Sequence, residues 1–174
     1  MKLFRKVGLL TVLLSLLMVS SAWANDLTWG NTNGHHEPSI LLENGELSAS
    51  DSVYQWGRGE YLAEGSVEIV NQENGNIYIC IETYAYINVD KIFHSAMVDY
   101  WSDERNDWVQ VGCWDFEITK EEAGGSLSRL ISEFTLTGYE TDLYYRVRGL
   151  HGVEVYDEVE ACATRTNGVL ITDN

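Results

Sequence analysis

The stretch that decides the fold is Ile77-Tyr-Ile-Cys-Ile-Glu-Thr-Tyr-Ala-Tyr-Ile-Asn-Val89. Apolar residues recur in it at every second position, and a period of two over so many residues is typical of a β-strand with one buried face. We therefore predict that its isoleucine face packs into a core. The opposite face of the same strand is predicted to carry three tyrosines: Tyr78, Tyr84 and Tyr86.

The segments on either side repeat this pattern and pair into hairpins. The strand Glu60–Val70 comes first, and the Asn74-Gly75 pair that follows it predicts a turn with positive φ angles. Ala96–Trp101 and Trp108–Ile118 flank a polar turn and form a second hairpin. The apolar residues of its return strand change phase midway, so we predict a β-bulge at Gly112-Cys113.

The C-terminal half continues with four further strands: Leu127–Thr137, Leu143–Gly149, Val153–Ala163 and Val169–Ile171. In the second of these, alternate residues from Leu143 are predicted to face inward. Arg146 and Arg148, beside Tyr144, are predicted to lie on an ordinary solvated face with ring stacking. No helical period competes with these strands. The pattern favours an all-β fold, a single antiparallel β-sandwich of about seven to nine strands over residues 53–174.

Two segments precede this domain. Residues 1–24 have the parts of a signal peptide: a basic start, an apolar helix too short to span a bilayer, and Ala22-Trp-Ala24 before the expected cleavage site. We expect a secreted protein without a membrane segment after cleavage; an uncleaved membrane anchor is the alternative. Residues 25–52 are rich in turn formers and predict a loosely ordered segment with one short strand at Ile40–Leu42.

Composition limits the partners. The chain has 27 acidic and 11 basic side chains, and removal of the first 24 residues leaves eight basic ones and a net charge of −19 with histidine neutral. Such a surface repels nucleic acids, whereas cations, basic proteins and neutral sugars remain compatible with it. Solubility alone is the simpler explanation of the acidity.

The chain has three cysteines, Cys80, Cys113 and Cys162, an odd number for a protein expected to be exported. At most one intramolecular disulfide can form among them, and three buried free thiols are equally compatible with the sequence. Their spacing matches no zinc pattern.

Two groups of potential metal ligands are better explained without a metal. His35-His36-Glu37 are adjacent, so an extended backbone turns them to opposite faces, and His94 and His151 are distant in the chain. The segment Asp99–Asp107, around Asp103, is crowded with oxygen ligands, but its spacing differs from that of an EF-hand. We expect a solvated turn there, with calcium as the alternative, and no cofactor.

Several motifs resemble those of a known family: Gly138-Tyr139, Leu143-Tyr-Tyr-Arg-Val-Arg-Gly-Leu-His151, Thr166-Asn-Gly-Val-Leu-Ile171 and Trp108-Val-Gln-Val-Gly-Cys-Trp114. Over Asp51–Thr172 the chain resembles an uncharacterised family of small exported Gram-positive bacterial proteins, a domain of unknown function. The resemblance implies export and a bacterial source. It implies no site residue, because the family has no assigned activity.

A weaker likeness exists at the level of fold. Thr141 and the following Tyr145-Arg-Val-Arg resemble the strand after the corner tyrosine in fibronectin type III and immunoglobulin-like domains. The likeness implies that Tyr145 closes such a corner, and it implies nothing about function.

No motif commits the domain to catalysis. Gly124-Gly-Ser-Leu-Ser128 lacks a glycine of the nucleophile elbow, and so many acids make any chosen carboxylate pair uninformative. We therefore expect a non-catalytic protein that binds cell-envelope carbohydrate or another protein through the Tyr78, Tyr84 and Tyr86 rings, although core packing of these rings is the simpler reading. Two other functions stay open: a secreted effector or antimicrobial factor, and a hydrolase with a site assembled from scattered acids.

Overall fold

The computed structural model of the protein describes Trp29, residues 32–34, 38–55, Gly57 and residues 59–173. The predicted signal peptide, residues 1–24, and the His35-His36-Glu37 motif lie outside these residues. Within the described part of the chain, no helix has the length and apolarity needed to cross a membrane.

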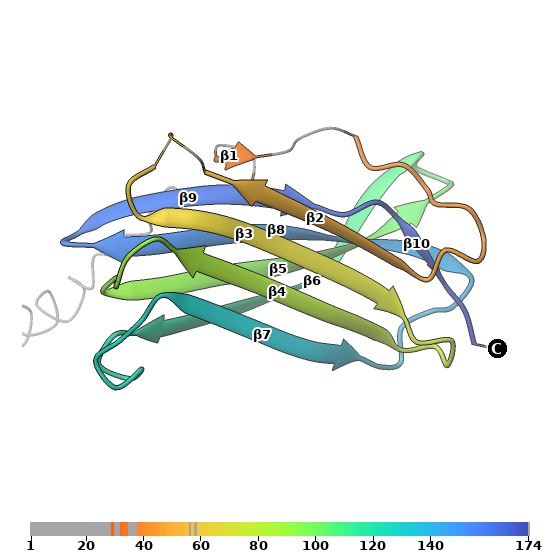
Figure 1. Cartoon of the computed structure of the whole chain (residues 1–174). Coiled ribbons are helices and arrows are strands. Elements are labelled where there is room, and N and C mark those ends of the chain that lie inside the picture. Colours follow the sequence, from red (N-terminus) through yellow and green to blue (C-terminus); the bar gives the residue numbers. More distant parts are fainter. Residues whose placement is uncertain (1–28, 30–31, 35–37, 56, 58, 174) are drawn as a thin grey trace, which may run out of the picture.

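Strands dominate the described residues and form two sheets that pack face to face (Figure 1). The strands are β1 (Asn33–Gly34), β2 (Ser48–Tyr54), β3 (Leu62–Asn71), β4 (Ile77–Ala85), β5 (Lys91–Ser102), β6 (Asp107–Thr119), β7 (Arg129–Leu136), β8 (Leu143–Val155), β9 (Glu158–Arg165) and β10 (Val169–Ile171). One sheet has the order β1-β9-β8-β5-β6, with β10 pairing with the start of β8, and the other has the order β2-β3-β4-β7. The named strands pair antiparallel except β1 with β9, which confirms the predicted sandwich.

The core fills the layer between the two inner faces. Ile77, Ile79 and Ile81 of β4 are fully buried there, as predicted, and pack with Val98 of β5 and Val147 of β8. These side chains come from both sheets, so burial of apolar surface holds the layers together.

The strand β4 ends at Ala85, short of the predicted end at Val89. Beyond it the backbone leaves the ladder, and the N–H of Val89 donates to the carbonyl of Leu127, outside β7. Ile87 is 45% exposed as a result. The apolar alternation continues past the strand because Val89 still packs in the core, from a loop.

The strand β2 begins at Ser48, so the predicted domain boundary between residues 52 and 53 falls inside a strand. Serines occupy every second position of β2 and form its outer face. An antiparallel sheet tolerates small polar residues on its solvent side. The same residues give the segment the composition of a loop. The predicted strand Ile40–Leu42 is wrong: Leu41 forms only an isolated bridge with Gly168.

The strand β8 runs unbroken through residues 150–152, where the sequence predicts a break. Gly152 serves packing there, because a Cβ atom would lie 2.1 Å from the ring of Phe93. The chain turns instead at Tyr156 and Asp157, whose φ angles of 49° and 67° are typical of a two-residue hairpin turn.

Three local predictions can be compared with the structure. The Tyr145 hydroxyl donates to the carbonyl of Glu140 at 2.8 Å and closes the expected tyrosine corner. The β5–β6 ladder has its bulge at Val111, one residue before the predicted position. The β3–β4 turn uses positive φ at Glu73 and Gly75, rather than at both members of the predicted Asn-Gly pair.

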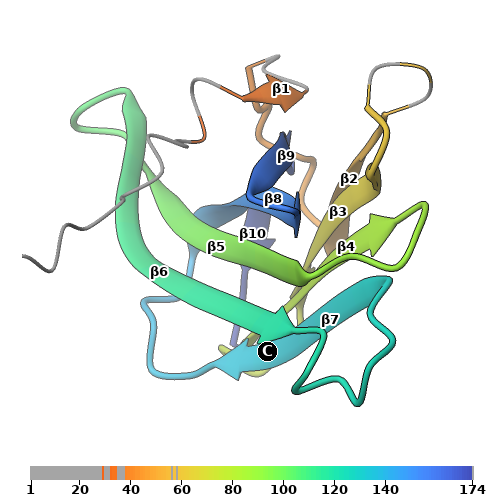
Figure 2. The same ribbon diagram turned by 90° about the vertical axis from the view of Figure 1, so that its left-hand side faces the viewer.

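The two flanks of the sandwich differ. On one flank, Asp51 of β2 accepts the N–H of Arg165 of β9 at 2.8 Å, across the gap between the sheets. Nearby, the Glu160 carboxylate accepts three successive N–H groups at 2.7–3.0 Å, those of Glu60, Tyr61 and Leu62. On the other flank, β6 and β7 are the outermost strands of their sheets (Figure 2).

Candidate functional site

The outer face of the four-stranded sheet carries the predicted tyrosines. Because side chains alternate along each strand, the residues opposite the buried isoleucines of β4 share a surface with alternate residues of β2, β3 and β7. We call this surface the Tyr–Glu face. Its central residues are Tyr54, Glu64, Ser66, Glu68, Tyr78, Cys80, Glu82, Tyr84 and Glu133.

Glutamates orient the two tyrosines of β4. The Tyr78 hydroxyl donates to Glu133 Oε1 at 2.8 Å, and the Tyr84 hydroxyl donates to Glu82 Oε2 at 3.3 Å. The hydrogen bond with Glu133, and then partial burial, raise the pKa of Tyr78. Partial burial and the charge of Glu82 raise the pKa of Tyr84. Both rings are therefore neutral and held in fixed orientations at physiological pH.

A third ring comes from β2. Tyr54 is 58% exposed and faces Glu64 across the β2–β3 ladder, and a hydrogen bond with Glu64, together with its charge, raises the pKa of Tyr54. The sequence carries one signal for it, the alternating serines that lead to Tyr54. Tyr86, by contrast, lies beyond the end of β4, where its N–H donates to the carbonyl of Tyr61. The prediction that Tyr86 lies on the same strand as Tyr78 and Tyr84 is therefore wrong, because β4 ends at Ala85.

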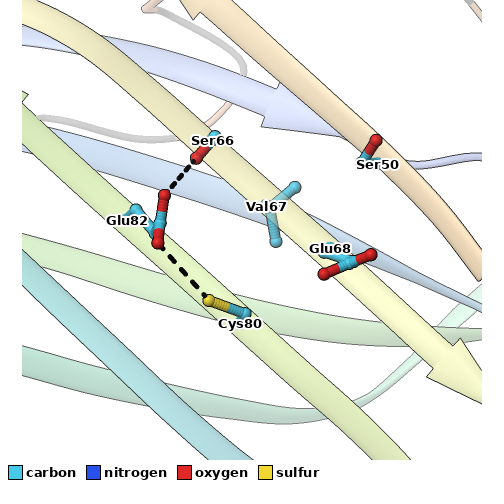
Figure 3. Close-up of a pocket in the computed structure, with 6 residues that line it drawn as sticks. All are labelled: Ser50, Ser66, Val67, Glu68, Cys80 and Glu82. Atoms are coloured by element: carbon cyan, nitrogen blue, oxygen red, sulfur yellow. Dashed lines mark hydrogen bonds between the residues drawn. The ribbon is translucent and has the colours of Figure 1, made fainter.

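Glu82 is one of the residues that line a pocket of about 270 Å³ on this face. Figure 3 shows its carboxylate between Ser66 and Cys80. The Ser66 hydroxyl donates to Oε2 at 3.3 Å, and Cys80 Sγ lies 3.9 Å from Oε1. Burial, and then the charges of Glu82 and Glu133, raise the pKa of Cys80 to about 11, so its thiol stays protonated.

The Tyr–Glu face is negatively charged. Glu64, Glu68, Glu82 and Glu133 share it, and Arg129 lies across from Tyr84 at its margin. Carboxylates and serine hydroxyls beside aromatic rings can accept hydrogen bonds from a polyhydroxylated ligand while the rings contact its apolar faces. In the described residues, no group of three or more His, Cys, Asp or Glu side chains is arranged to hold a metal ion.

A chain of hydrogen bonds crosses the interior and joins both sheets. Thr164 Oγ1 lies 2.8 Å from Nε2 of His151, whose Nδ1 lies 3.0 Å from Thr83 Oγ1. Thr83 Oγ1 lies 3.1 Å from Nδ1 of His94, and His94 Nε2 lies 2.9 Å from Ser132 Oγ. Each of these five side chains thus has a hydrogen-bond partner, as buried polar groups require.

The Ser132–His94 contact has the geometry of a nucleophile and a base, but its electrostatics do not fit that role. Burial lowers the pKa of His94 to about 4, and burial together with the neighbouring His94 lowers that of His151 to about 3. A general base works best with a pKa near the working pH, so an imidazole of this kind accepts a proton poorly at pH 7. Ser132 also lies within the strand β7 and not on a sharp turn.

The outer face of the six-stranded sheet holds a second polar group, which we call the Trp–Arg cluster: Trp29, Asp99, Trp108, Arg146, Arg148 and Arg165. The buried Asp99 carboxylate accepts hydrogen bonds from Nε of Arg146 and of Arg148, each at 2.8 Å. Arg146 lies 4.4 Å from the Trp108 ring centre. The arginine side chains are 11% and 17% exposed, so the predicted solvated face is wrong.

The remaining predictions concern metals and thiols. The Asp99 carboxylate is paired with Arg146 and Arg148. The Asp103 carboxylate accepts the indole N–H of Trp101 at 2.9 Å. All three cysteines are free: Cys80 and Cys113 lie on the outer faces of opposite sheets, and Cys162 is buried between them. Disulfide geometry requires Cα atoms within about 7 Å, which these positions exclude.

Comparison with known proteins identifies the family of the chain. The sequence matches the family of unknown function DUF6147 over residues 31–169. A comparison with curated proteins finds no match. The match includes the sandwich strands from β2 to β9 and confirms the resemblance to a family without assigned activity. The chain belongs to the family of unknown function DUF6147.

Proposed function

We propose that this protein is a secreted, non-catalytic binding protein whose Tyr–Glu face binds carbohydrate of the cell envelope. One observation carries the proposal. Three tyrosine–glutamate pairs, with rings from β2 and β4, share one face of the sheet with a solvent-open pocket that Ser50, Ser66 and Glu82 help to line. A sugar ring presents apolar C–H groups and hydroxyl donors, which these rings and oxygen acceptors complement.

The low pKa of His94 supports the non-catalytic part of the proposal, because the one serine–histidine pair described above lacks an effective base. Secretion rests on the sequence of residues 1–24, which has a basic start, an apolar stretch and small residues before the expected cleavage site. The effector and hydrolase alternatives have no comparable support in the described residues.

Binding to a glycan array and to isolated cell-wall fractions, with and without calcium, tests the proposal. We expect saturable binding by the purified protein and at least a tenfold loss in a Tyr54→Ala/Tyr84→Ala variant. Tyr156→Ala is the matched control, because Tyr156 is 87% exposed and lies on the β8–β9 turn. Circular dichroism must show that the double variant stays folded.

The outcomes separate the alternatives. Absence of binding in all conditions, or equal loss in the control, would contradict the carbohydrate proposal. Tyr86→Ala tests the ring that the sequence placed in the site, and we expect a smaller loss for it because Tyr86 lies beyond the end of β4.

A further inference from the structure

The flank of the sandwich that β6 and β7 form has two strand edges and a cleft between them. Among the named strands, β6 pairs only with β5, and β7 pairs only with β4, so each has one free edge. Figure 2 shows both strands at the same side of the molecule. Free edges expose unpaired N–H and C=O groups and are sites where an extended chain can add as a further strand.

The cleft has a volume of about 600 Å³ and follows the backbone of β6. Four consecutive residues of β6, Asp115 to Ile118, line it, together with Leu130 and Ser132 of β7 and Glu122 of the connecting loop. Side chains of consecutive strand residues point to opposite faces, so only a cleft that lies along the strand edge can be lined by all four.

The two sides of this edge have opposite chemistry. Phe116 and Ile118 point inward, where Leu130 provides the facing apolar wall. Asp115 and Glu117 point outward, and Glu117 remains 66% exposed even though it pairs with Lys91 at 2.6 Å. An added strand would therefore place alternate side chains against apolar and acidic surfaces.

We propose that the β6–β7 cleft binds an extended segment of a partner protein, in which apolar and basic residues alternate and which pairs with β6 as an added strand. The apolar side chains of the segment enter the cleft, and its lysines or arginines meet Asp115 and Glu117. Charge complementarity selects this partner, since the cleft rim and the chain as a whole, at −16, are acidic. The proposal is independent of the Tyr–Glu face.

A blocked octapeptide of alternating valine and lysine is the probe. We expect saturable binding to the isotope-labelled protein, with backbone amide shift changes at residues 115–118 and 130–132. A serine–lysine peptide and a valine–glutamate peptide should bind at least tenfold more weakly. Two N-methylated versions, one blocked at every valine and one at every lysine, each remove the donors of one peptide edge, so one of them should lose binding.

Protein variants complete the test. Asp115→Asn/Glu117→Gln should weaken binding at least threefold, whereas Glu64→Gln/Glu68→Gln on the Tyr–Glu face is the matched control and should leave it unchanged. The proposal is overturned if the peptide does not bind, if shift changes lie on the Tyr–Glu face, or if the serine–lysine peptide binds equally well. Tolerance of both N-methylations would overturn the strand pairing.

Discussion

The Thr83 hydroxyl oxygen lies 3.1 Å from Nδ1 of His94, in the layer between the two sheets. The same oxygen lies 3.0 Å from Nδ1 of His151. A hydroxyl has one proton, so Thr83 donates to one ring and accepts from the other. The two neutral imidazoles must therefore be opposite tautomers, and a proton added to either ring places a charge in a buried layer.

The first prediction concerns pH. The folded pKa values of His94 and His151, about 4 and about 3, lie below the ordinary value of 6.5, so the unfolded chain binds protons that the folded chain excludes. The stability from these rings is complete above pH 6.5 and is lost as the pH falls toward 4. At about 1.4 kcal/mol per pKa unit, we expect a loss of about 4 kcal/mol between pH 7.5 and 5 in urea unfolding.

Proton NMR of the imidazole C–H resonances checks the cause directly. His94 and His151 should keep constant chemical shifts from pH 8 to pH 5 while the protein remains folded. Titration of either ring near pH 6.5 would show that the interior is hydrated and would contradict the prediction.

The second prediction is that Thr83→Val destabilises the protein by about 2–6 kcal/mol. The change keeps the shape of the side chain but leaves a ring nitrogen of each histidine without its partner in a buried layer, and each unsatisfied group costs about 1–3 kcal/mol. Thr135→Val, on the exposed face of β7, is the matched control and should change the free energy of unfolding by less than about 0.5 kcal/mol. Equal effects of the two substitutions would sink the idea.

Periodicity was sufficient to predict most of the fold. The isoleucines of β4 are buried as their spacing predicts, and the tyrosine corner and the phase change before Cys113 are visible in the sequence. The errors have local physical causes. Gly152 resembles a turn residue but makes room for Phe93, and the serines of β2 resemble a loop but form the outer face of a sheet.

The sites were less predictable, because they combine residues that are distant in the chain. Tyr78 and Tyr84 follow from alternation along one strand, but Tyr54 joins them through the register of β2 with β3. The imidazoles of His94 and His151 meet Thr83 only because β4 packs over β5 and β8. No spacing within one segment encodes such contacts across two sheets.

The third prediction concerns the flank on which Glu160 of β9 contacts the start of β3. Glu160 accepts three backbone N–H groups at the start of β3, and Gly59 leaves room for its carboxylate, since a Cβ atom there would lie 2.5 Å from Oε2. Glu160→Gln keeps the shape but replaces one acceptor oxygen by a donor. Because hydrogen bonds to a carboxylate are stronger than neutral ones, we expect a loss of about 1.5–3 kcal/mol.

Hydrogen exchange locates that effect. The amides of Tyr61 and Leu62 should exchange faster in Glu160→Gln, whereas Glu104→Gln, in the exposed β5–β6 turn, should leave both the exchange and the stability unchanged. Unchanged protection of these two amides in Glu160→Gln would show that the carboxylate does not hold the start of β3.

The last prediction concerns Asp99 in the Trp–Arg cluster. Its side chain is 2% exposed, so Asp99→Asn leaves the guanidinium groups of Arg146 and Arg148 largely buried without their counter-charge. Removal of one partner from a buried ion pair costs about 3–5 kcal/mol. We expect a loss of about 3 kcal/mol in urea unfolding, with Asp103→Asn as the control, because an asparagine oxygen there can still accept the Trp101 indole N–H.

A triple variant distinguishes the missing charge from a simple loss of hydrogen bonds. Asp99→Leu/Arg146→Met/Arg148→Met removes the buried charges together, and apolar replacement of a whole buried ion cluster is often neutral or stabilising. We expect this variant to be more stable than Asp99→Asn, even though it gives up the contact of Arg146 with the Trp108 ring. If the triple variant is instead the less stable of the two, the arginines stabilise the sheet mainly through their ring contacts, and the carboxylate is secondary.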